Sequence, residues 1–491
     1  MNNKENHIQS LVNNDVDLNL QSKDTKIKPL QFWVFKNSKP IINAGLLTDF
    51  LELNNFRTLS IKGYNETVKF ENNIVTIYTP QQIYNFGLEY VKRQKNDILR
   101  NEYIKIVESI IVSKKATLGS LKTLELKPFK DTREVALICF KNGFTVVLND
   151  TINFHNYSKL NKLIPGYFIY ESQIIKRNYN KNTDYKQAQF YEFTKLITNS
   201  EKHFLNVVTA LGYLLHKYKN PSIAKAIILS DILSQASNTA QGRSGKGILI
   251  QALHQFLNIA EYNGKNVDLS KDKFVFQSIT LLTNLFLLQD VQQSFNFEDL
   301  FAVLTDKMSI ERKHQVKIIL DFIDSPKIAL TTNYTINNTG GSFTDRKHLV
   351  FINNYFNSLH KPEQHFKNLF FSEWDHKEYE CFDAFMIYCI QTYLNHGLVE
   401  YNSPELEKKS IENNTSKSFV NAMETHFNKT DEYYNIKELA KFVDEVVSME
   451  TRTKSKTIVK WLNVWATYKG LTLEKRLSSG ITKFKLHLLK S

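Results

Sequence analysis

The sequence predicts an α/β protein whose central part holds a mostly parallel sheet. Three observations predict it. Strand-like and helix-like runs alternate over roughly residues 190–395, a glycine-rich turn there leads directly into a helix with an apolar stripe, and two apolar runs there end in a carboxylate or an amide.

The chain has 491 residues, and domains of about 100–200 residues suggest two to four of them. Hydrophobic residues make up 42% of the sequence, which is enough for several buried cores.

Charge and cysteine content narrow the classes of protein that fit. The chain has a formal net charge of +13 and a pI near 9.2, which favours a polyanionic partner, either nucleic acid or an acidic membrane face. No run of about 18 apolar residues occurs, so no membrane span is expected. Cys139, Cys381 and Cys389 form no C-x-x-C pair, which argues against a disulfide framework or a zinc ribbon and favours a reducing, intracellular setting. His376 lies near the last two, but the spacing matches no standard metal site. We therefore expect Cys381 and Cys389 to occupy buried positions on one helix.

Composition divides the chain into five parts. The predicted parts are a disordered tail over 1–28, a mixed α+β domain over 29–190, the α/β core over 191–395, a linker over 396–431 and a small domain over 432–491. In the second part, Ile74–Tyr78 and Val135–Phe140 predict strands, and Gln81–Ile111 is a helical stretch. Asn142-Gly143 predicts a hairpin turn after the second of these strands. The polar stretch Lys176–Lys186 predicts the connection to the core.

The glycine-rich turn is Ala240-Gln-Gly-Arg-Ser-Gly-Lys-Gly247, which fits the phosphate-loop pattern G-x-x-x-x-G-K-[ST] in part. Backbone N–H groups of such a loop wrap phosphates, and its lysine reaches the β- and γ-phosphates. An apolar stripe from Ile248 to Leu257 predicts the helix that follows. Ala240 stands at the first Gly position and Gly247 at the Ser/Thr position of the pattern. The hydroxyl that usually holds magnesium is therefore missing. A surface turn without a ligand is the alternative. The candidate nucleotide-binding residues are Gly242, Arg243, Ser244, Gly245, Lys246 and Gly247.

Two apolar runs after the loop end in polar residues. Asn284–Asp290 predicts a doubly buried parallel strand with a carboxylate at its end, where P-loop enzymes present an acid to magnesium. Lys327–Asn333 predicts a second strand, whose terminal amide lies beside that acid if the strand order is normal. A core strand that ends in a turn residue explains either run alone. Arg346 then precedes a third apolar run, Leu349–Ile352.

Four features taken together resemble superfamily 3 helicases: the glycine-rich loop, the strand that ends at Asp290, the strand that ends at Asn333, and Arg346 after them. They are most similar to the phage and satellite primase–helicase proteins related to the poxvirus-type helicase. The matching segments are Gly242–Lys246, Leu287–Val291, Ser325–Tyr334 and Asp345–Lys347, and the resemblance covers roughly 200–395. It implies an AAA+ core that assembles into a ring, commonly a hexamer, around DNA. ATP and Mg²⁺ are the implied cofactors, and the cytoplasm of a bacterial host is the implied setting.

The resemblance also implies residue roles. Lys246 would bind the nucleotide phosphates, Asp290 would serve the magnesium or polarise the attacking water, and Asn333 would sense the γ-phosphate. Arg346 would reach into the neighbouring subunit's site and stabilise charge on the transferred phosphoryl group. The family's DNA-gripping hairpin falls on Ser309–Lys317, although a solvated basic hairpin is the plainer explanation. Its candidate DNA contacts are Arg312, Lys313, His314 and Lys317.

Two functions therefore remain open for the core. The first is an ATP-dependent replicative DNA helicase that couples hydrolysis to translocation or unwinding. The second is an initiator or loader that binds nucleotide and DNA without efficient hydrolysis. It is motivated by Gly247, which stands where relatives carry Ser or Thr, and by Gln289, which stands where they carry a second acid. A transcriptional regulator is a third idea, and the length and the α/β core argue against it.

Residues 433–491 predict a winged-helix DNA-binding domain. They hold ten Lys and two Arg against one Asp and four Glu, a net +7. Ile436–Val447 and Lys454–Tyr468 predict two helices, Gly470 ends the second, and the alternating runs after it predict a two-stranded wing around Ser478–Gly480. A basic cap that binds nothing is the alternative. The candidate DNA contacts are Lys454, Lys456 and Lys460 on the helix, and Lys475, Arg476, Lys483 and Lys485 on the wing.

The part over 29–190 shows no obvious chemistry. A primase module needs paired acids at strand ends to hold divalent metal. The Asp-x-Asp pair near the N-terminus, Asp15-Val-Asp17, lies in the predicted tail, so no primase activity is expected. A primase remnant, a collar for ring assembly, or an adaptor for a separate primase or polymerase all remain open for this part.

Overall fold

The structure is a computed structural model, and it describes most of the chain from residue 30 onward. Not described are 1–29, 62–63, 232–243, 293, 314–316, 334–344, 403–406, 409–410, 413, 444–445, 447–450, 479–480 and 489–491. The chain divides into two units, Met1–Thr183 with His216–Tyr218, and Asp184–Leu215 with Lys219–Ser491. The boundary falls within the polar stretch expected to be a connection, and the predicted tail over 1–28 lies outside the described residues.

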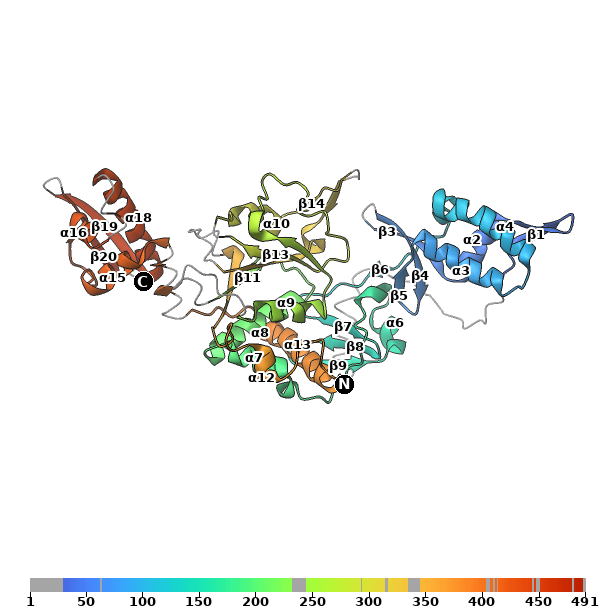
Figure 1. Cartoon of the computed structure of the whole chain (residues 1–491), viewed down its shortest axis with the longest axis horizontal. Helices are drawn as coiled ribbons and strands as arrows, with labels where there is room; N and C mark the ends of the chain where they lie inside the picture. Colours follow the sequence, from blue (N-terminus) through green and yellow to red (C-terminus); the bar gives the residue numbers. More distant parts are fainter. Residues whose placement is uncertain are drawn as a thin grey trace. The chain divides into compact units, whose positions relative to one another are not determined.

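The first unit is mixed α and β (Figure 1). Its main elements are β1 (Trp33–Lys36), β2 (Lys39–Ile42), α2 (Ala44–Leu53), β3 (Phe56–Ile61), β4 (Tyr64–Glu71), β5 (Ile74–Ile77), α3 (Pro80–Lys92), α4 (Asp97–Val107), α5 (Ala116–Gly119), β6 (Lys127–Pro128), β7 (Ala136–Phe140), β8 (Gly143–Val147), β9 (Ile152–His155), α6 (Leu160–Leu163) and β10 (Tyr167–Tyr170). Its sheets are β3-β4-β5-β10-β6, β7-β8-β9 and the hairpin β1-β2. Strands β7 and β8 are buried at every position, β3 and β5 bury only some of their side chains, and the helices supply the rest of the core.

The local predictions for this unit hold with one refinement. The Asn142-Gly143 hairpin is confirmed: β7 and β8 pair antiparallel, with Phe140 opposite Gly143. Gly143 has φ +156°, and a Cβ there would lie 2.3 Å from the His155 carbonyl oxygen, so only glycine fits. The predicted helical stretch is two helices, because Asn96 accepts the Leu99 N–H at 3.0 Å and starts α4 anew.

The second unit holds a five-stranded parallel sheet of order β12-β13-β16-β11-β17. Its elements are α7 (Gln189–Leu196), α8 (Glu201–Leu215), β11 (Ala226–Asp231), α9 (Lys246–His254), β12 (Ile259–Asn263), β13 (Leu285–Val291), α10 (Phe301–Thr305), β14 (Met308–Ile310), β15 (Ile318–Leu320), β16 (Lys327–Thr332), β17 (Lys347–Ile352), α12 (Pro362–Phe366) and α13 (His376–His396). The predicted parallel α/β core is confirmed, and so are its two polar-tipped strands, which lie side by side as β13 and β16.

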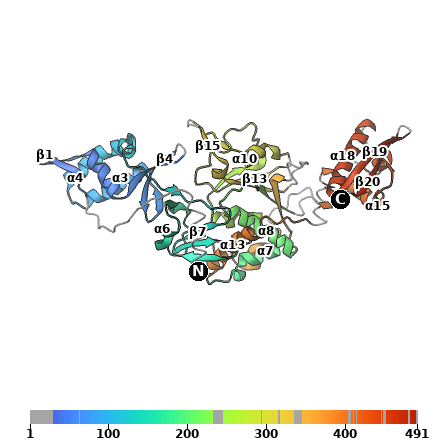
Figure 2. The same cartoon turned by 180° about the vertical axis from the view of Figure 1, so that it is seen from behind.

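The central strands are buried on both faces, which explains their continuous apolar runs. Phe286 and Leu288 of β13 join a cluster with Phe297 and Leu300 on one face of the sheet. Leu287, which alternates with them, is equally buried. In Figures 1 and 2 the helices α8, α9 and α13 lie together on one side of this sheet.

Helices α8 and α13 approach so closely that a glycine is needed between them. A Cβ on Gly212 of α8 would lie 2.0 Å from the Cys389 carbonyl oxygen and 2.7 Å from the Tyr393 Cβ. Cys381 and Cys389 are buried on α13, in the helix positions expected of them. The two backbones therefore touch at a point where no side chain can be inserted.

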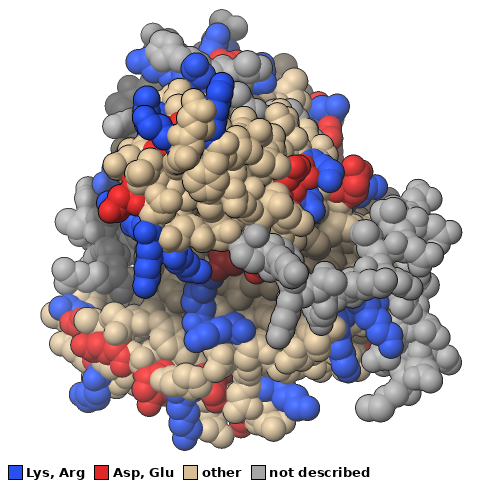
Figure 3. Space-filling view, turned by 90° about the vertical axis from the view of Figure 1, so that its right-hand side faces the viewer, with Lys and Arg blue, Asp and Glu red and all other residues tan. Residues whose placement is uncertain are grey.

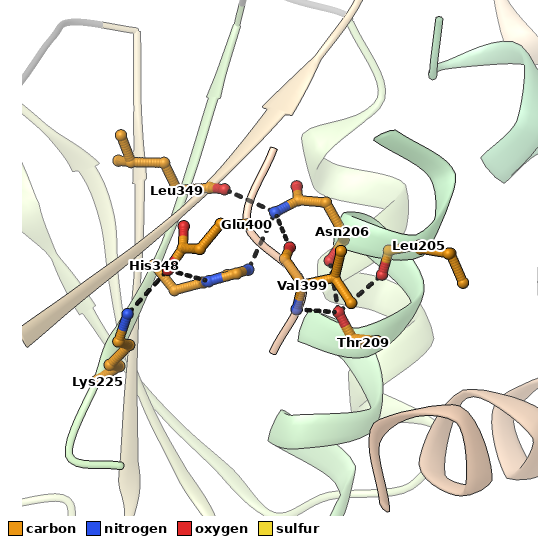
Figure 4. A network of polar contacts seen from close by, with 8 residues as sticks. All are labelled: Leu205, Asn206, Thr209, Lys225, His348, Leu349, Val399 and Glu400. Atoms are coloured by element: carbon orange, nitrogen blue, oxygen red, sulfur yellow. Dashed lines mark hydrogen bonds and ion pairs between the residues drawn. The ribbon is translucent and has the colours of Figure 1, made fainter. Parts of the chain in front are cut away.

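A buried asparagine ties α8 to the sheet and to the chain that follows α13 (Figure 4). The Asn206 amide donates to the Leu349 carbonyl at 3.2 Å and to the Val399 carbonyl at 2.8 Å. Its nitrogen also lies 3.1 Å from Nε2 of His348 on β17. These contacts satisfy two backbone carbonyls from different segments, so the segment around Val399 belongs to the core fold.

An ion pair closes the same network. Lys225 Nζ lies 2.8 Å from Glu400 Oε1, and His348 Nδ1 lies 3.3 Å from the same oxygen. Burial alone raises the pKa of Glu400, but hydrogen bonds and charge from His348 and Lys225 outweigh it and lower this pKa to about 2. Glu400 therefore stabilises the fold above its ordinary pKa near 4.5, and this contribution is lost as the pH falls toward 2.

The prediction of a linker over 396–431 is wrong at both ends of this range, because both ends are structured. Its first residues belong to the network of Figure 4. Near its end lies α15 (Lys417–Thr425), whose Phe419 and Met423 are buried with Ile458 and Trp465 in the C-terminal core. The last domain then contains α15, β18 (Tyr434–Asn435), α16 (Ile436–Lys441), α18 (Thr451–Lys469), β19 (Leu471–Ser478) and β20 (Ile481–Leu488), with sheet order β18-β20-β19.

Charge is widely distributed on the described surface. In the space-filling view of Figure 3, Lys and Arg side chains are spread over the face with broad uncharged areas between them. Among the described residues, no helix is both long and apolar enough to cross a membrane.

Candidate phosphate-binding site

The glycine-rich turn leads into α9 at the carboxyl edge of the parallel sheet. Gly245 has φ +110° and is the N-cap of α9, which begins at Lys246. A Cβ on Gly245 would lie 2.7 Å from the Phe193 ring, so a side chain is excluded twice, by the backbone angle and by contact. The first N–H groups of a helix have no partner within it, which suits this end of α9 to bind an anion. Gly242 and Arg243 lie outside the described residues.

The Lys246 ammonium lies between the ends of two strands. It forms an ion pair with Asp231, the last residue of β11, and it donates to Asn333 Oδ1 at 2.7 Å just after β16. Ser244 donates to the other Asp231 oxygen. The exposed fraction is 11% for the Lys246 side chain and 8% for that of Asp231, so solvent screens this pair little. The structure thus brings together Lys246 and Asn333, as predicted, and adds Asp231.

Asp290 is presented at the same edge by an irregular strand end. The register of β13 against β16 shifts between Leu288 and Val291, and Asp290 has φ +55°. Its N–H donates to Thr331 Oγ1 at 2.9 Å, which fixes the distortion, and its side chain is exposed. Because Mg²⁺ at nucleotide sites takes one or two carboxylates together with phosphate oxygens and water, Asp290 fits this ion. Among the described residues, no three His, Cys, Asp or Glu gather to hold a metal on their own.

The neighbouring strand β12 supplies an acid that the sequence did not reveal. Gln289 Nε2 donates to Glu261 Oε2 at 2.6 Å, and Glu261 Oε1 lies 2.5 Å from His254 Nε2. The position expected to carry a second acid is therefore an amide held by a glutamate. Only the strand order could have shown this pairing. By contrast, Asp231 ends an apolar run just as Asp290 does, and that signal was visible in the sequence.

A cavity of about 540 Å³ opens beside the start of α9. Gly247, Ile248 and Gln251 line one side, and Pro362, Leu369 and Phe370 line the other. Most of these groups are apolar, as in pockets that hold flat organic ligands. Gly245 also lines the cavity, so the cavity reaches the N-terminus of α9.

Arg346 lies at the opposite edge of the sheet. Strands β11 and β17 are parallel, with Ala226 opposite Lys347 and Asp231 opposite Ile352, so Arg346 is six residues below the level of Asp231. At about 3.3 Å a residue this is about 20 Å. Its guanidinium lies over the Phe301 ring, 4.7 Å from the centroid. The structure does not bring Arg346 to the Lys246 of the same chain.

The predicted basic hairpin exists, with one residue in an unexpected role. Strands β14 and β15 pair antiparallel, and Lys313 and Lys317 are exposed. Arg312 instead donates to the Gln277 carbonyl at 3.1 Å and to the Ile279 carbonyl, so it anchors the hairpin. Lys317 lies 3.5 Å from a Glu311 oxygen. His314 lies outside the described residues.

The C-terminal domain presents a polar stripe along α18. Lys456, Lys460, Asn463 and Thr467 recur at helical spacing and are exposed, whereas Ile458, Leu462 and Trp465 on the other face are buried. Lys454 is half-buried. This stripe is the surface that α18 offers to a partner.

The strands β19 and β20 carry the remaining candidates. Arg476 pairs across the strands with Lys483, and Lys475 is exposed. Glu474 lies 3.7 Å from the Lys485 ammonium and 2.7 Å from His487, so Lys485 is partly neutralised within the domain. Arg476, Lys475 and Lys483 are therefore better placed than Lys485 to meet an external anion.

Comparisons with known proteins give distant structural likeness and no sequence family. No protein-family model matches the chain, and no curated protein does. Among solved structures, the chain is similar to the apo C-terminal region of NrS-1 in its A form, at 11% identity and a TM-score of 0.34, covering 72% of this chain and 97% of that one. It is also similar to a JCV helicase with a substituted acetamide bound, at 14% identity and a TM-score of 0.24, covering 49% of this chain and 72% of that one. Likeness at this level carries no inference about individual residues or their roles.

Proposed function

We propose that this protein is an ATP-dependent DNA helicase with a P-loop core of the AAA+ type, related to superfamily 3. The observation that carries the proposal is the position of Lys246, between Asp231 and Asn333 at the carboxyl edge of a parallel sheet. Ligands of open α/β sheets bind at that edge. The strand that ends at Asn333 separates the loop strand from the acid strand, so all three ends can face one phosphate group.

The arrangement divides the work among the residues. The α9 N-terminus and Lys246 hold the phosphates, and Asn333 is placed to touch the terminal one. Asp290 would hold Mg²⁺, which neutralises charge on the phosphates when bound. The cavity beside Ile248 would take the base. Arg346 lies about 20 Å from the level of Asp231 in its own chain, so a role in hydrolysis would require the site of a neighbouring copy, as in a ring.

Nucleotide binding tests the phosphate site. Lys246→Ala is expected to weaken binding of a fluorescent ATP analogue about 100-fold, because it removes the cation that meets the phosphates. Lys265→Ala is the matched control, because this exposed lysine lies just beyond β12 at the same edge of the sheet. It should change the affinity less than about twofold. Equal binding by the Lys246→Ala protein would contradict the assignment of the site.

We propose that the C-terminal domain is a winged helix that binds duplex DNA through α18. Over its described residues the order is α15, β18, α16, α18, β19 and β20, with β18 paired to β20. This is the arrangement in which the helix before the wing enters the major groove. The polar stripe on α18 and the cations of β19 and β20 support this proposal, and Lys313 and Lys317 of the β14–β15 hairpin provide a second candidate DNA contact.

Salt dependence tests the DNA contact. Lys456→Ala with Lys460→Ala is expected to reduce the slope of log affinity against log salt by about 2, since each phosphate contact contributes about 0.9. The pair Lys437→Ala and Lys441→Ala on α16 is the control, because these exposed lysines lie on another helix of the same domain. An unchanged slope in the α18 variant, with a changed slope in the control, would assign the contact to α16 instead.

A second candidate function has an observation of its own. Gly247 provides no hydroxyl for magnesium, and Gln289 is held by Glu261. A nucleotide-binding DNA initiator or loader that hydrolyses ATP poorly would show these features. Nucleotide binding without turnover, together with salt-sensitive DNA binding, would favour this function over a motor.

A further inference from the structure

The positive charge of Lys246 is balanced by Asp231, a residue that lies outside the P-loop sequence pattern. Asp231 stands 15 residues before Lys246, at the end of the strand that precedes the loop, and its carboxylate meets both Lys246 and Ser244. The exposed fractions of 8% and 11% place the pair inside the protein. A buried lysine without a partner is costly, so this carboxylate stabilises the site in its empty state.

The same contact opposes a phosphate. The Lys246 ammonium has three N–H donors, of which one meets Asp231 and one meets Asn333. A nucleotide that binds Lys246 must either displace the carboxylate or place its own negative oxygens beside it. Like charges repel strongly in a site that solvent screens little. The affinity for nucleotide therefore includes the cost of separating this pair.

We propose that Asp231 is a positioning residue that holds Lys246 while no nucleotide is bound and releases it to the phosphates. The inference rests on the proposed nucleotide site and adds a regulation of it: the carboxylate lowers the affinity of the empty site for nucleotide. Ser244 also donates to the Asp231 carboxylate, so a movement of this carboxylate away from Lys246 would also free the Ser244 hydroxyl. A residue that only supports the fold would have the opposite effect when replaced, because a distorted site binds less tightly.

The test is the affinity of the full chain for a fluorescent ADP analogue in the presence of EDTA, so that no divalent cation bridges the carboxylate to the phosphates. Asp231→Asn keeps the size and a hydrogen-bonding group, and removes the charge. It is expected to tighten binding about tenfold or more. Glu261→Gln is the matched control, since it removes a charge at the same edge that contacts Gln289 and His254 rather than Lys246. It should change the affinity less than about twofold.

A thermal measurement keeps the proposal testable if the empty variant is unstable. Asp231→Asn is expected to lower the Tm without ligand and to show a larger rise of Tm with ADP than the unmodified protein. Asp231→Ser is expected to behave in the same way. Unchanged or weaker ADP binding by a folded Asp231 variant would overturn the inference alone, provided that the unmodified protein binds and Lys246→Ala does not. Failure of the unmodified protein to bind nucleotide would overturn the proposed function as well.

Discussion

Replacing Arg346 by alanine is expected to reduce ATP turnover about 1,000-fold or more while leaving nucleotide binding by the same subunit unchanged. An arginine that enters a neighbour's site stabilises charge in the transition state, and its loss costs about this much. The nucleotide site of the same chain is about 20 Å from Arg346 along the strand direction, so nucleotide binding there should not change. Steady-state turnover and binding of an ATP analogue, measured on the same preparation, separate the two effects.

Mixing and a neighbouring substitution control this result. Equal amounts of the Arg346→Ala and Lys246→Ala proteins should recover turnover at roughly a quarter of the interfaces, where one subunit supplies the lysine and the other the arginine. Phe301→Leu removes the ring beneath the guanidinium and keeps the arginine, so it should retain most of the turnover. Full turnover by Arg346→Ala alone would show that the arginine has no part in the reaction.

Replacing Gly212 by alanine is expected to destabilise the second unit by about 3 kcal/mol or more. The added Cβ would lie 2.0 Å from the Cys389 carbonyl oxygen, so α8 and α13 would have to separate along a buried contact. The Tm of this unit should fall by about 6 °C or more. Thermal unfolding followed by circular dichroism measures the change.

Gly247→Ala is the matched substitution. A Cβ on Gly247 would have nothing within 4 Å, and this residue lies in the first turn of α9. Alanine is the better helix former by about 1 kcal/mol, so the Tm should stay the same or rise. A Gly212→Ala protein as stable as the unmodified one would show that α8 and α13 can repack, and that the close approach is not required.

Much of the core could be predicted because its signals are local. The strands that end at Asp290 and Asn333 are buried on both faces, so their apolar runs are continuous and their polar ends stand out. The turn at Asn142-Gly143 follows from the backbone angles that such a turn needs. In the C-terminal domain, α16, α18 and the two strands β19 and β20 followed from helical and alternating periods, whereas β18 was not predicted.

The rest depends on neighbours that are distant in the sequence. Arg312 looked like a DNA contact, but carbonyl groups more than 30 residues earlier hold it. Helix α15 was taken for linker because its outward face is polar, and only the packed core shows that Phe419 and Met423 are buried. The Asp231–Lys246 pair needs the carboxyl edge of the sheet to be assembled before the two residues meet.

ATP hydrolysis by the purified full chain, with and without single-stranded DNA, distinguishes a DNA-driven motor from a DNA-binding initiator. We expect turnover that rises with DNA and disappears in the Lys246→Ala protein, while Lys265→Ala behaves like the unmodified chain. Bound nucleotide without turnover, whether or not DNA is present, would contradict a motor and leave the DNA-binding initiator as the function that fits the site.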